Sequence, residues 1–173
     1  TVFVTHDRDE ALALGDQVAV MIGGRILQID VPERVFANPI NEVVARFVGV
    51  ETILPGHVRA VSDGLADVEV QGWTLQVAAT LTPGERVLVC LRPEEVTLFP
   101  KGTTAALSSA RNRLHGRVVR HLPTGPIYRV TIDCGVLLVA AVTRQSWEEL
   151  GLADGAEVVA SFKATAPHVI HRA

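Results

Sequence analysis

The sequence predicts a mainly β protein in which two related small β-modules follow a short α/β segment. Up to about residue 50, apolar runs alternate with capped helical segments, whereas from residue 51 onward short alternating strands are broken by Gly and Pro. Gly56-His57-Val58 also recurs as Gly116-Arg117-Val118, which indicates an internal repeat. We therefore expect an α/β segment at 1–50, a first module at 51–100 and a second at 101–173, with 100–104 as the linker. A single continuous barrel built from both copies is the alternative.

The first 50 residues predict a small set of elements. Residues 1–5 have the pattern of a buried strand, and a short helix follows to about residue 14, with Asp7 as its N-cap and Glu10 completing a capping box. Apolar runs at 17–22 and 25–29 are joined by Gly23-Gly24, a hairpin signal. Pro32 suits the first position of one helix and Asn41 the cap of another, which ends near Gly49. This is too little material to close a doubly wound sheet.

The second copy of the repeat is longer than the first. Pro83-Gly84-Glu85-Arg86-Val87 matches Asp154-Gly155-Ala156-Glu157-Val158, and each copy then reaches a cation eight residues after its Gly, Arg92 in the first and Lys163 in the second. The second copy also contains an insert at 146–151 that predicts one capped helical turn.

Composition limits the classes of function. The chain has 173 residues with a formal charge of −3, and its apolar stretch at 136–142 is far shorter than the ~18 residues of a membrane-spanning helix. Cys90 and Cys134 lie within apolar alternating segments, which favours free thiols in a reducing cytosol. The chain opens without Met on a strand pattern, so we expect a piece of a longer protein. The net negative charge and an aromatic content of 5% argue against nucleic-acid binding.

The distribution of charge and of metal-ligating residues indicates which part of the chain could bind a ligand. Residues 1–100 carry 7 basic and 14 acidic side chains (−7), and 101–173 carry 9 and 5 (+4), which favours the C-terminal part as the host of an anion. His168 and His171 could offer two imidazoles to a metal, but no Cys, Asp or Glu lies nearby, and we expect no metal site. Trp73 and Trp147 are interpreted as packing residues.

His6 follows an apolar run and precedes a capped helix, which would place its ring where α/β proteins bind ligands. A satisfied structural His is the alternative. The run Thr5-His6-Asp7, Glu10-Ala11-Leu12, Val18-Ala19-Val20-Met21, Gly24-Arg25-Ile26 and Pro32-Glu33 closely resembles the C-terminal end of the ATP-binding subunit of ABC importers. The resemblance implies that His6 is the switch histidine that contacts the γ-phosphate of ATP. Because the sequence has no Gly-x-x-x-x-Gly-Lys-Ser/Thr loop and no Leu-Ser-Gly-Gly-Gln segment, we expect no Mg-ATP binding and no enzyme activity in this chain.

Three further segments combine cations, hydroxyls and backbone donors without a carboxylate. They are Ser109-Ala110-Arg111-Asn112, Thr143-Arg144-Gln145-Ser146 and Lys163-Ala164-Thr165. Such a donor set suits a tetrahedral oxyanion. The alternative is purely structural: Ser146 as an N-cap with Glu149 closing the box, Arg111 and Lys163 as solvated charges, and Thr143 and Thr165 as strand residues.

The same segments, with Leu114-x-Gly116-x-Val118 and Leu150-Gly151-Leu152, resemble the OB-like Mop module, also called TOBE, over about residues 108–171. The resemblance implies that Ser109, Ala110, Arg111 and the segment Lys163-Ala164-Thr165 line an oxyanion pocket. Thr143 and Ser146 would come from a neighbouring chain. Asn112 is also expected among the oxyanion-binding residues, but it is ranked below the others because it is a turn-forming residue that shapes the loop. The first module lacks these segments, so we expect it to be structural.

Two functions stay open at this point. In the first, the chain is the C-terminal region of a molybdate or tungstate importer ATPase that binds the oxyanion, contacts a second copy and modulates transport. In the second, its barrels only dimerise an importer ATPase for sugars, sulfate or iron. Either resemblance implies a cytoplasmic protein at the inner face of the membrane, a homodimer or higher oligomer, and permease subunits and Mg-ATP as partners of the longer protein.

Overall fold

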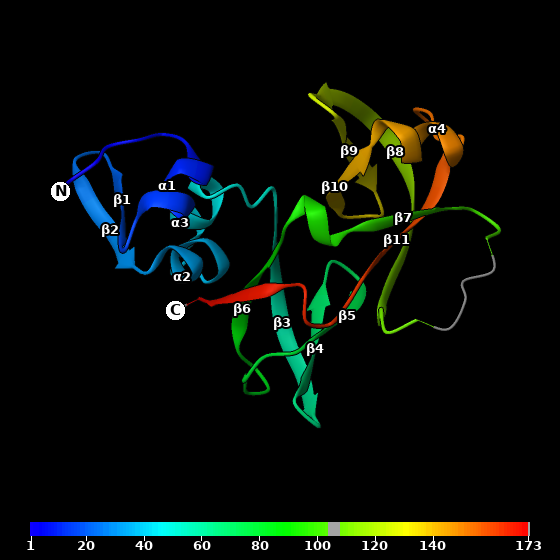
Figure 1. The fold of residues 1–173 in the computed structure, drawn as a ribbon. Helices are drawn as coiled ribbons and strands as arrows, with labels where there is room; N and C mark the ends of the chain where they lie inside the picture. The colour runs from blue at the N-terminus through cyan, green and yellow to red at the C-terminus, as the bar shows by residue number, and fades with distance from the viewer. Residues whose placement is uncertain (104–107, 173) are drawn as a thin grey trace. The chain divides into compact units, whose positions relative to one another are not determined.

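A computed structural model describes residues 1–103 and 108–172, so residue 104 of the expected linker lies outside the described residues. The chain forms two compact units, Thr1–Val50 and Glu51–Ala173 (Figure 1). Within the described residues, no helix is long and apolar enough to span a membrane. The prediction of a mainly β chain with two related modules after a short α/β segment is confirmed.

The first unit contains three short helices and one hairpin. Helices α1 (Arg8–Leu14), α2 (Pro32–Ala37) and α3 (Glu42–Phe47) accompany strands β1 (Val18–Ile22) and β2 (Arg25–Asp30). The Asp7 carboxylate accepts hydrogen bonds from the first turn of α1, and the Asn41 side chain accepts one from Val44 N at 2.9 Å, as the cap pattern predicted. Gly23 and Gly24 both have positive φ, which explains why this dipeptide forms the turn of the hairpin.

The strand predicted for residues 1–5 is wrong. This segment has no regular secondary structure, and Val2 and Val4 are 93% and 89% exposed. An apolar strand is stabilised by backbone hydrogen bonds to a neighbouring strand and by burial of its faces. In the described residues, β1 and β2 pair only with each other, so residues 1–5 have neither.

The second unit contains two five-stranded antiparallel sheets. The first sheet has the strand order β12-β6-β3-β4-β5 and the second has the order β10-β9-β8-β11-β7. The strands of the first repeat are β3 (Thr52–Ser62), β4 (Leu65–Val70), β5 (Trp73–Val77) and β6 (Arg86–Leu91), followed by the 3-10 helix η1 (Pro93–Glu95) and β7 (Thr97–Pro100). Those of the second are β8 (Asn112–Thr124), β9 (Ile127–Asp133), β10 (Leu137–Thr143), β11 (Glu157–Phe162) and β12 (His168–His171), with helix α4 (Arg144–Glu149) after β10.

The two sheets exchange their fifth strands, so they do not follow the expected boundary at residue 100. Strand β7 leaves the first repeat and pairs with β11, and β12 returns from the second repeat to pair with β6 (Figure 1). Each repeat supplies four strands to its own sheet, which leaves β6 and β11 as open edges. The exchanged strands cover these edges.

The sheets share one hydrophobic core. Buried side chains from both repeats form a single cluster, with Val68 and Leu75 from the first sheet and Ile132 and Leu138 from the second. The repeated glycines are explained by close packing. A Cβ atom on Gly56 would lie 2.6 Å from Val68 Cγ1, and one on Gly116 would lie 2.5 Å from Cys134 Sγ. Each glycine therefore allows the neighbouring strand of its own sheet to pack closely.

Both cysteines are buried and free, as their apolar surroundings predicted. Burial and, to a smaller extent, the neighbouring Asp133 carboxylate raise the pKa of the Cys134 thiol to about 11. Cys134 is therefore protonated at neutral pH and packs as a small apolar side chain.

Candidate functional site

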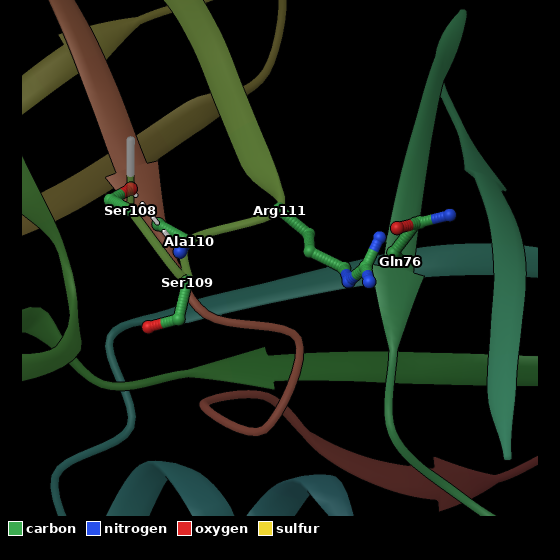
Figure 2. Close-up of a pocket in the computed structure, with 5 residues that line it drawn as sticks. All are labelled: Gln76, Ser108, Ser109, Ala110 and Arg111. Carbon is green, nitrogen blue, oxygen red and sulfur yellow. Dashed lines mark hydrogen bonds between the residues drawn. The ribbon is translucent and has the colours of Figure 1, made fainter. Parts of the chain in front are cut away.

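A polar pocket of about 420 Å³ lies where the two sheets meet at the start of β8. It is lined by Gln76 from β5 and by the segment Ser108, Ser109, Ala110 and Arg111. The Arg111 side chain extends from the start of β8 toward Gln76 (Figure 2). Within the described residues that line this pocket there is no carboxylate. Its guanidinium, hydroxyls and amide suit an anion.

Asn112 fastens this pocket to the first sheet. Its side chain is 3% exposed, its Oδ1 accepts from Gln76 N at 2.8 Å, and its Nδ2 donates to Gln76 O at 2.9 Å. The amide thus satisfies both backbone groups of one residue on β5, as a neighbouring strand would. Asn112 is buried behind the pocket rather than on its surface, and it positions Arg111 and Gln76 along one rim. Asn112 thus begins strand β8 and joins it to β5, and its expected place among the oxyanion-binding residues stays a prediction.

Ser108 orders the segment that carries Ser109 and Ala110. Its Oγ accepts from Ala110 N at 3.3 Å and from Arg113 Nη2 at 3.1 Å. A serine hydroxyl that accepts from a backbone N–H two residues later forms a local turn. This turn bends the chain immediately before β8 and exposes the Ser109 hydroxyl (Figure 2).

Arg111 and Lys163 are the residues immediately beyond one end of the ladder between β8 and β11. That ladder ends at the pair Asn112 and Phe162, and Lys163 is not among the described residues that line the pocket. Residues opposite each other in antiparallel strands have Cβ atoms roughly 5 Å apart, and like charges there are destabilising. Both side chains are exposed. Two cations therefore gather at one strand end.

Ala164 and Thr165 continue this edge in different ways. Ala164 is buried, and its carbonyl accepts from Ala78 N at 2.8 Å, which ties the turn after β11 to the end of β5. Thr165 is exposed in the same turn, which is closed by a hydrogen bond from Ala166 N to Lys163 O at 3.1 Å. Neither residue lines the described pocket, so Ala164 acts through its backbone.

Thr143 and Ser146 lie at the other end of β8. Thr143 pairs with Ile127, which pairs with Thr124 at the end of β8, whereas Arg111 precedes its first residue. Twelve strand residues separate these ends, roughly 40 Å along the chain at ~3.3 Å per residue. One chain therefore does not bring Ser146 to its own Arg111.

The structural alternative for Ser146 is wrong in one detail. Thr143, not Ser146, caps α4: its Oγ1 accepts from Ser146 N at 3.1 Å and donates to Ser146 Oγ at 2.9 Å. The cap and the helix begin three residues earlier than the insert predicted, because Thr143 ends β10 and can cap the helix directly. The Thr143 hydroxyl proton is used internally, and the Ser146 hydroxyl keeps its own proton as a donor.

The equivalent strand end in the first sheet has a different charge pattern. The ladder between β3 and β6 ends at Thr52 and Leu91, so Glu51 and Arg92 follow side by side where the second sheet has Arg111 and Lys163. Thr52 corresponds to Asn112: it is 2% exposed, and its Oγ1 accepts from Val139 N at 3.0 Å. Glu51 also pairs with Arg129 at 3.1 Å. An acidic residue offsets the cations at this end.

The other residues singled out from the sequence lie elsewhere. His6 is exposed immediately before α1, in the first unit. His168 and His171 lie on β12 three residues apart and therefore point to opposite faces of the sheet. Among the described residues, no group of three or more His, Cys, Asp or Glu side chains could hold a metal ion. Trp147 is buried in the core and stacks on His121 at 4.5 Å between ring centroids, as expected of a packing residue.

Sequence reasoning missed two residues of the pocket, Ser108 and Gln76. Ser108 directly precedes the Ser-Ala-Arg-Asn segment, and a serine two residues before a strand entry is a turn signal that could have found it. Gln76 comes from the other repeat, and its proximity is a tertiary effect that no spacing indicates. Its Nε2 donates to Asp67 Oδ1 at 3.2 Å, because a carboxylate can only accept, and its Oε1 lies on the side of Arg111 (Figure 2).

The chain is similar to known proteins in sequence and in fold. The TOBE domain family matches residues 108–169. The chain is 38% identical over 173 residues to the molybdate/tungstate import ATP-binding protein WtpC of Pyrococcus horikoshii, a match that covers 97% of this chain and 46% of that protein. It is 39% identical over 145 residues to the spermidine/putrescine import ATP-binding protein PotA of Nitratidesulfovibrio vulgaris, over 81% of this chain and 39% of that protein. The chain thus spans about half the length of these relatives or less.

A solved structure shares the fold. The cytoplasmic molybdate-binding protein ModG, with molybdate bound, superposes with a TM-score of 0.60 at 25% identity, over 69% of this chain and 95% of ModG. The resemblance drawn from the sequence motifs, to importer ATP-binding subunits with a C-terminal oxyanion-binding module, is confirmed by these matches.

Proposed function

We propose that the second module, whose residues 108–169 match the TOBE domain family, binds a tetrahedral oxyanion, molybdate or tungstate. One observation carries the proposal: the described residues that line the pocket include Arg111 and no carboxylate, and a second cation, Lys163, comes immediately after the ladder partner of Asn112. Two like charges at that position repel each other, and a dianion would turn the repulsion into attraction. The first sheet has Glu51 at the equivalent position, so its charges are offset without a ligand.

The rest of the donor set would come from a second copy of the chain. Ser146 offers a free hydroxyl proton at the far end of β8, and only another molecule can bring it to Arg111. The site we propose is therefore shared between chains, with Arg111, Lys163 and the Ser109 hydroxyl on one side and Ser146, oriented by Thr143, on the other. Calorimetric titration with molybdate, tungstate, sulfate and phosphate tests this proposal directly. Absence of binding by molybdate and by tungstate would overturn it.

In the longer protein, this site would report the cytosolic oxyanion concentration to the importer. Such a protein would work on the cytoplasmic face of the membrane, with permease subunits and Mg-ATP, and His6 would serve as its switch histidine. An anion shared between chains favours the associated arrangement, and it can shift transport only through its different affinity for the two arrangements.

A second function, dimerisation without a ligand, has support from one observation. The PotA relative is named for spermidine and putrescine, which are cations, so a similar chain accompanies transport of substrates that would not bind an arginine pocket. The two functions differ in a measurable way, because a purely structural dimer has the same association constant with and without oxyanion.

We expect oxyanion to strengthen self-association of the wild-type chain and Ser146→Ala to weaken that effect, because the substitution removes the donor that crosses between copies. Sedimentation equilibrium with and without molybdate measures both quantities. Gln145→Ala is the matched control: it removes an exposed side chain of the same helix that bonds Glu149 at 2.7 Å. A stable monomer at micromolar concentration in the presence of molybdate would contradict the shared site.

We also expect no magnesium-dependent ATP hydrolysis by this chain, because it contains no Gly-x-x-x-x-Gly-Lys-Ser/Thr loop to hold the β- and γ-phosphates. Phosphate release measured with wild type and His6→Ala checks this expectation. Release above background that disappears in His6→Ala would show that the chain is an ATPase.

A further inference from the structure

The strand register aligns four charged or titratable positions across each sheet of the second unit. In the first sheet, His57 on β3 pairs with Glu69 on β4 and with Arg86 on β6, and Arg172 follows β12 beside Arg86. A hydrogen bond from Arg172 N to Arg86 O at 2.9 Å continues that ladder. Directly opposite residues in antiparallel strands share a face, so these four side chains form one row.

The second sheet has the corresponding row with a different charge pattern. Arg117 pairs with Asp133 and with Glu157, and Lys101 follows β7 beside Glu157. The hydrogen bond from Lys101 N to Glu157 O at 3.1 Å matches the one between Arg172 and Arg86. Signs alternate along this row, and Lys101 Nζ lies 2.7 Å from Glu157 Oε2. The hydrogen bond from Lys101, its charge and that of Arg117 lower the pKa of Glu157. This row neutralises itself.

In the first sheet, the two arginines of the row, Arg86 and Arg172, have no acidic residue of the row beside them to offset their charge. Arg86 stands where the second sheet has Glu157, so it lies beside a second cation, Arg172, instead of an opposite charge. Glu69 ends the row, but its carboxylate is in an ion pair with Arg59. The next acidic residue, Glu85, faces His171 at 3.4 Å and does not line the row.

The row also lies in a pocket. A surface cavity of about 280 Å³ is lined by residues of the row together with neighbours on β3 and β6: Pro55, Gly56, His57, Arg59, Glu69, Arg86, Val87 and Arg172. Its lining carries three arginines against one glutamate. The space is sufficient for a phosphate group with a small organic body, and guanidinium forks match the oxygen spacing of phosphate.

We propose that this cavity is a second anion site, and that it binds a phosphate group held by Arg86 and Arg172, with His57 beside them. It is separate from the oxyanion pocket, because it uses other strands and none of the same residues. The free anion and a small phosphate ester share the recognised chemistry. An ester would also place its organic part against the exposed ring of Pro55.

The test is calorimetric titration of the full chain with inorganic phosphate and, separately, with glycerol phosphate, at low ionic strength. Arg86→Glu introduces the acidic residue that the second sheet has at this position, and it should weaken phosphate binding at least 10-fold. Arg172→Ala should weaken it several-fold, and because it changes an exposed side chain it is expected to leave folding intact. Tighter binding of the ester than of the free anion would identify an ester as the ligand, and equal binding would identify the free anion.

Two matched controls separate this proposal from the oxyanion pocket. Lys101→Ala changes the equivalent position of the self-neutralised row, so it should bind phosphate as the wild type does. Arg111→Ala removes phosphate binding at the oxyanion pocket, so the binding that this variant keeps reports the second site alone. Phosphate binding that is lost in Arg111→Ala and retained in Arg86→Glu would overturn the second site, as would no phosphate binding at all. Self-association that depends on Arg86 and is insensitive to phosphate would also overturn it, by showing that the cavity binds an acidic surface of another copy.

Discussion

Replacing Arg111 or Lys163 with Ala is expected to cost roughly 2 to 5 kcal/mol of oxyanion binding, a loss of affinity of about 30-fold to several thousand-fold. Each change removes one of the two cations that lie immediately beyond the start of β8 and the end of β11. The bound dianion would then lack a charge-assisted donor in a partly desolvated site. Calorimetric titration of each variant with molybdate and tungstate measures the loss.

Arg92→Ala is the control for this prediction. Arg92 occupies the position in the first sheet that corresponds to Lys163, but Glu51 lies across from it. Removing it should leave oxyanion affinity almost unchanged. If Arg111→Ala and Lys163→Ala bind both oxyanions as tightly as the wild type, the proposed pocket is wrong even if the chain binds them elsewhere.

Asn112→Ala is expected to lower the free energy of unfolding by roughly 2 to 4 kcal/mol, because it leaves the N–H and C=O of Gln76 without their partners. Those two hydrogen bonds, of 2.8 and 2.9 Å, join the start of β8 to the first sheet. Urea denaturation at constant pH measures the change. Oxyanion affinity should also fall, because Arg111 would lose the neighbour that fixes its backbone.

Thr52→Val is the matched control at the equivalent position. It removes a single side-chain hydrogen bond, to Val139 N, and replaces the hydroxyl with a methyl group of similar volume, so it should cost about 1 to 2 kcal/mol. The interpretation of Asn112 as a joint between the sheets would be wrong if Asn112→Ala unfolds at the same urea concentration as the wild type.

Much of the fold could be predicted because local signals were strong. Asp7, Asn41 and the Gly23-Gly24 turn fixed the helices and hairpin of the first unit, and the repeated Gly56 and Gly116 marked equivalent strands that tolerate no side chain. The strand predicted for residues 1–5 is wrong because an apolar alternating segment forms a strand only beside another strand to which its backbone can hydrogen-bond. Nothing in the sequence of β7 or β12 indicates that they pair with the other repeat, since edge pairing depends on which edges stay open.

The sequence predicted the residue types of the site, but it predicted the geometry of the site only in part. The Ser-Ala-Arg-Asn segment led to the pocket, and the cation eight residues after Gly155 led to Lys163, which the register sets beside Arg111. Sequence reasoning could not find Gln76, because β5 reaches the pocket only through the packing of two sheets. Nor could it find the row of His57, Arg86 and Arg172, since only the pairing of four strands brings those residues together.

The exchange of β7 and β12 has a consequence for how the chain is made. During synthesis from the N-terminus, the first sheet has β3 to β6 available early, but β6 keeps an open edge until residues 168–171 leave the ribosome. Strand β7 is also synthesised before its partner, and it stays unpaired until β11 has been made. Strand β12 therefore completes the first sheet and connects the two repeats. The pairings of β12 with β6 and of β7 with β11 join residues that are far apart in the sequence, and such pairings slow folding. A polypeptide that lacks β12 would expose the edge of β6 and be prone to aggregation.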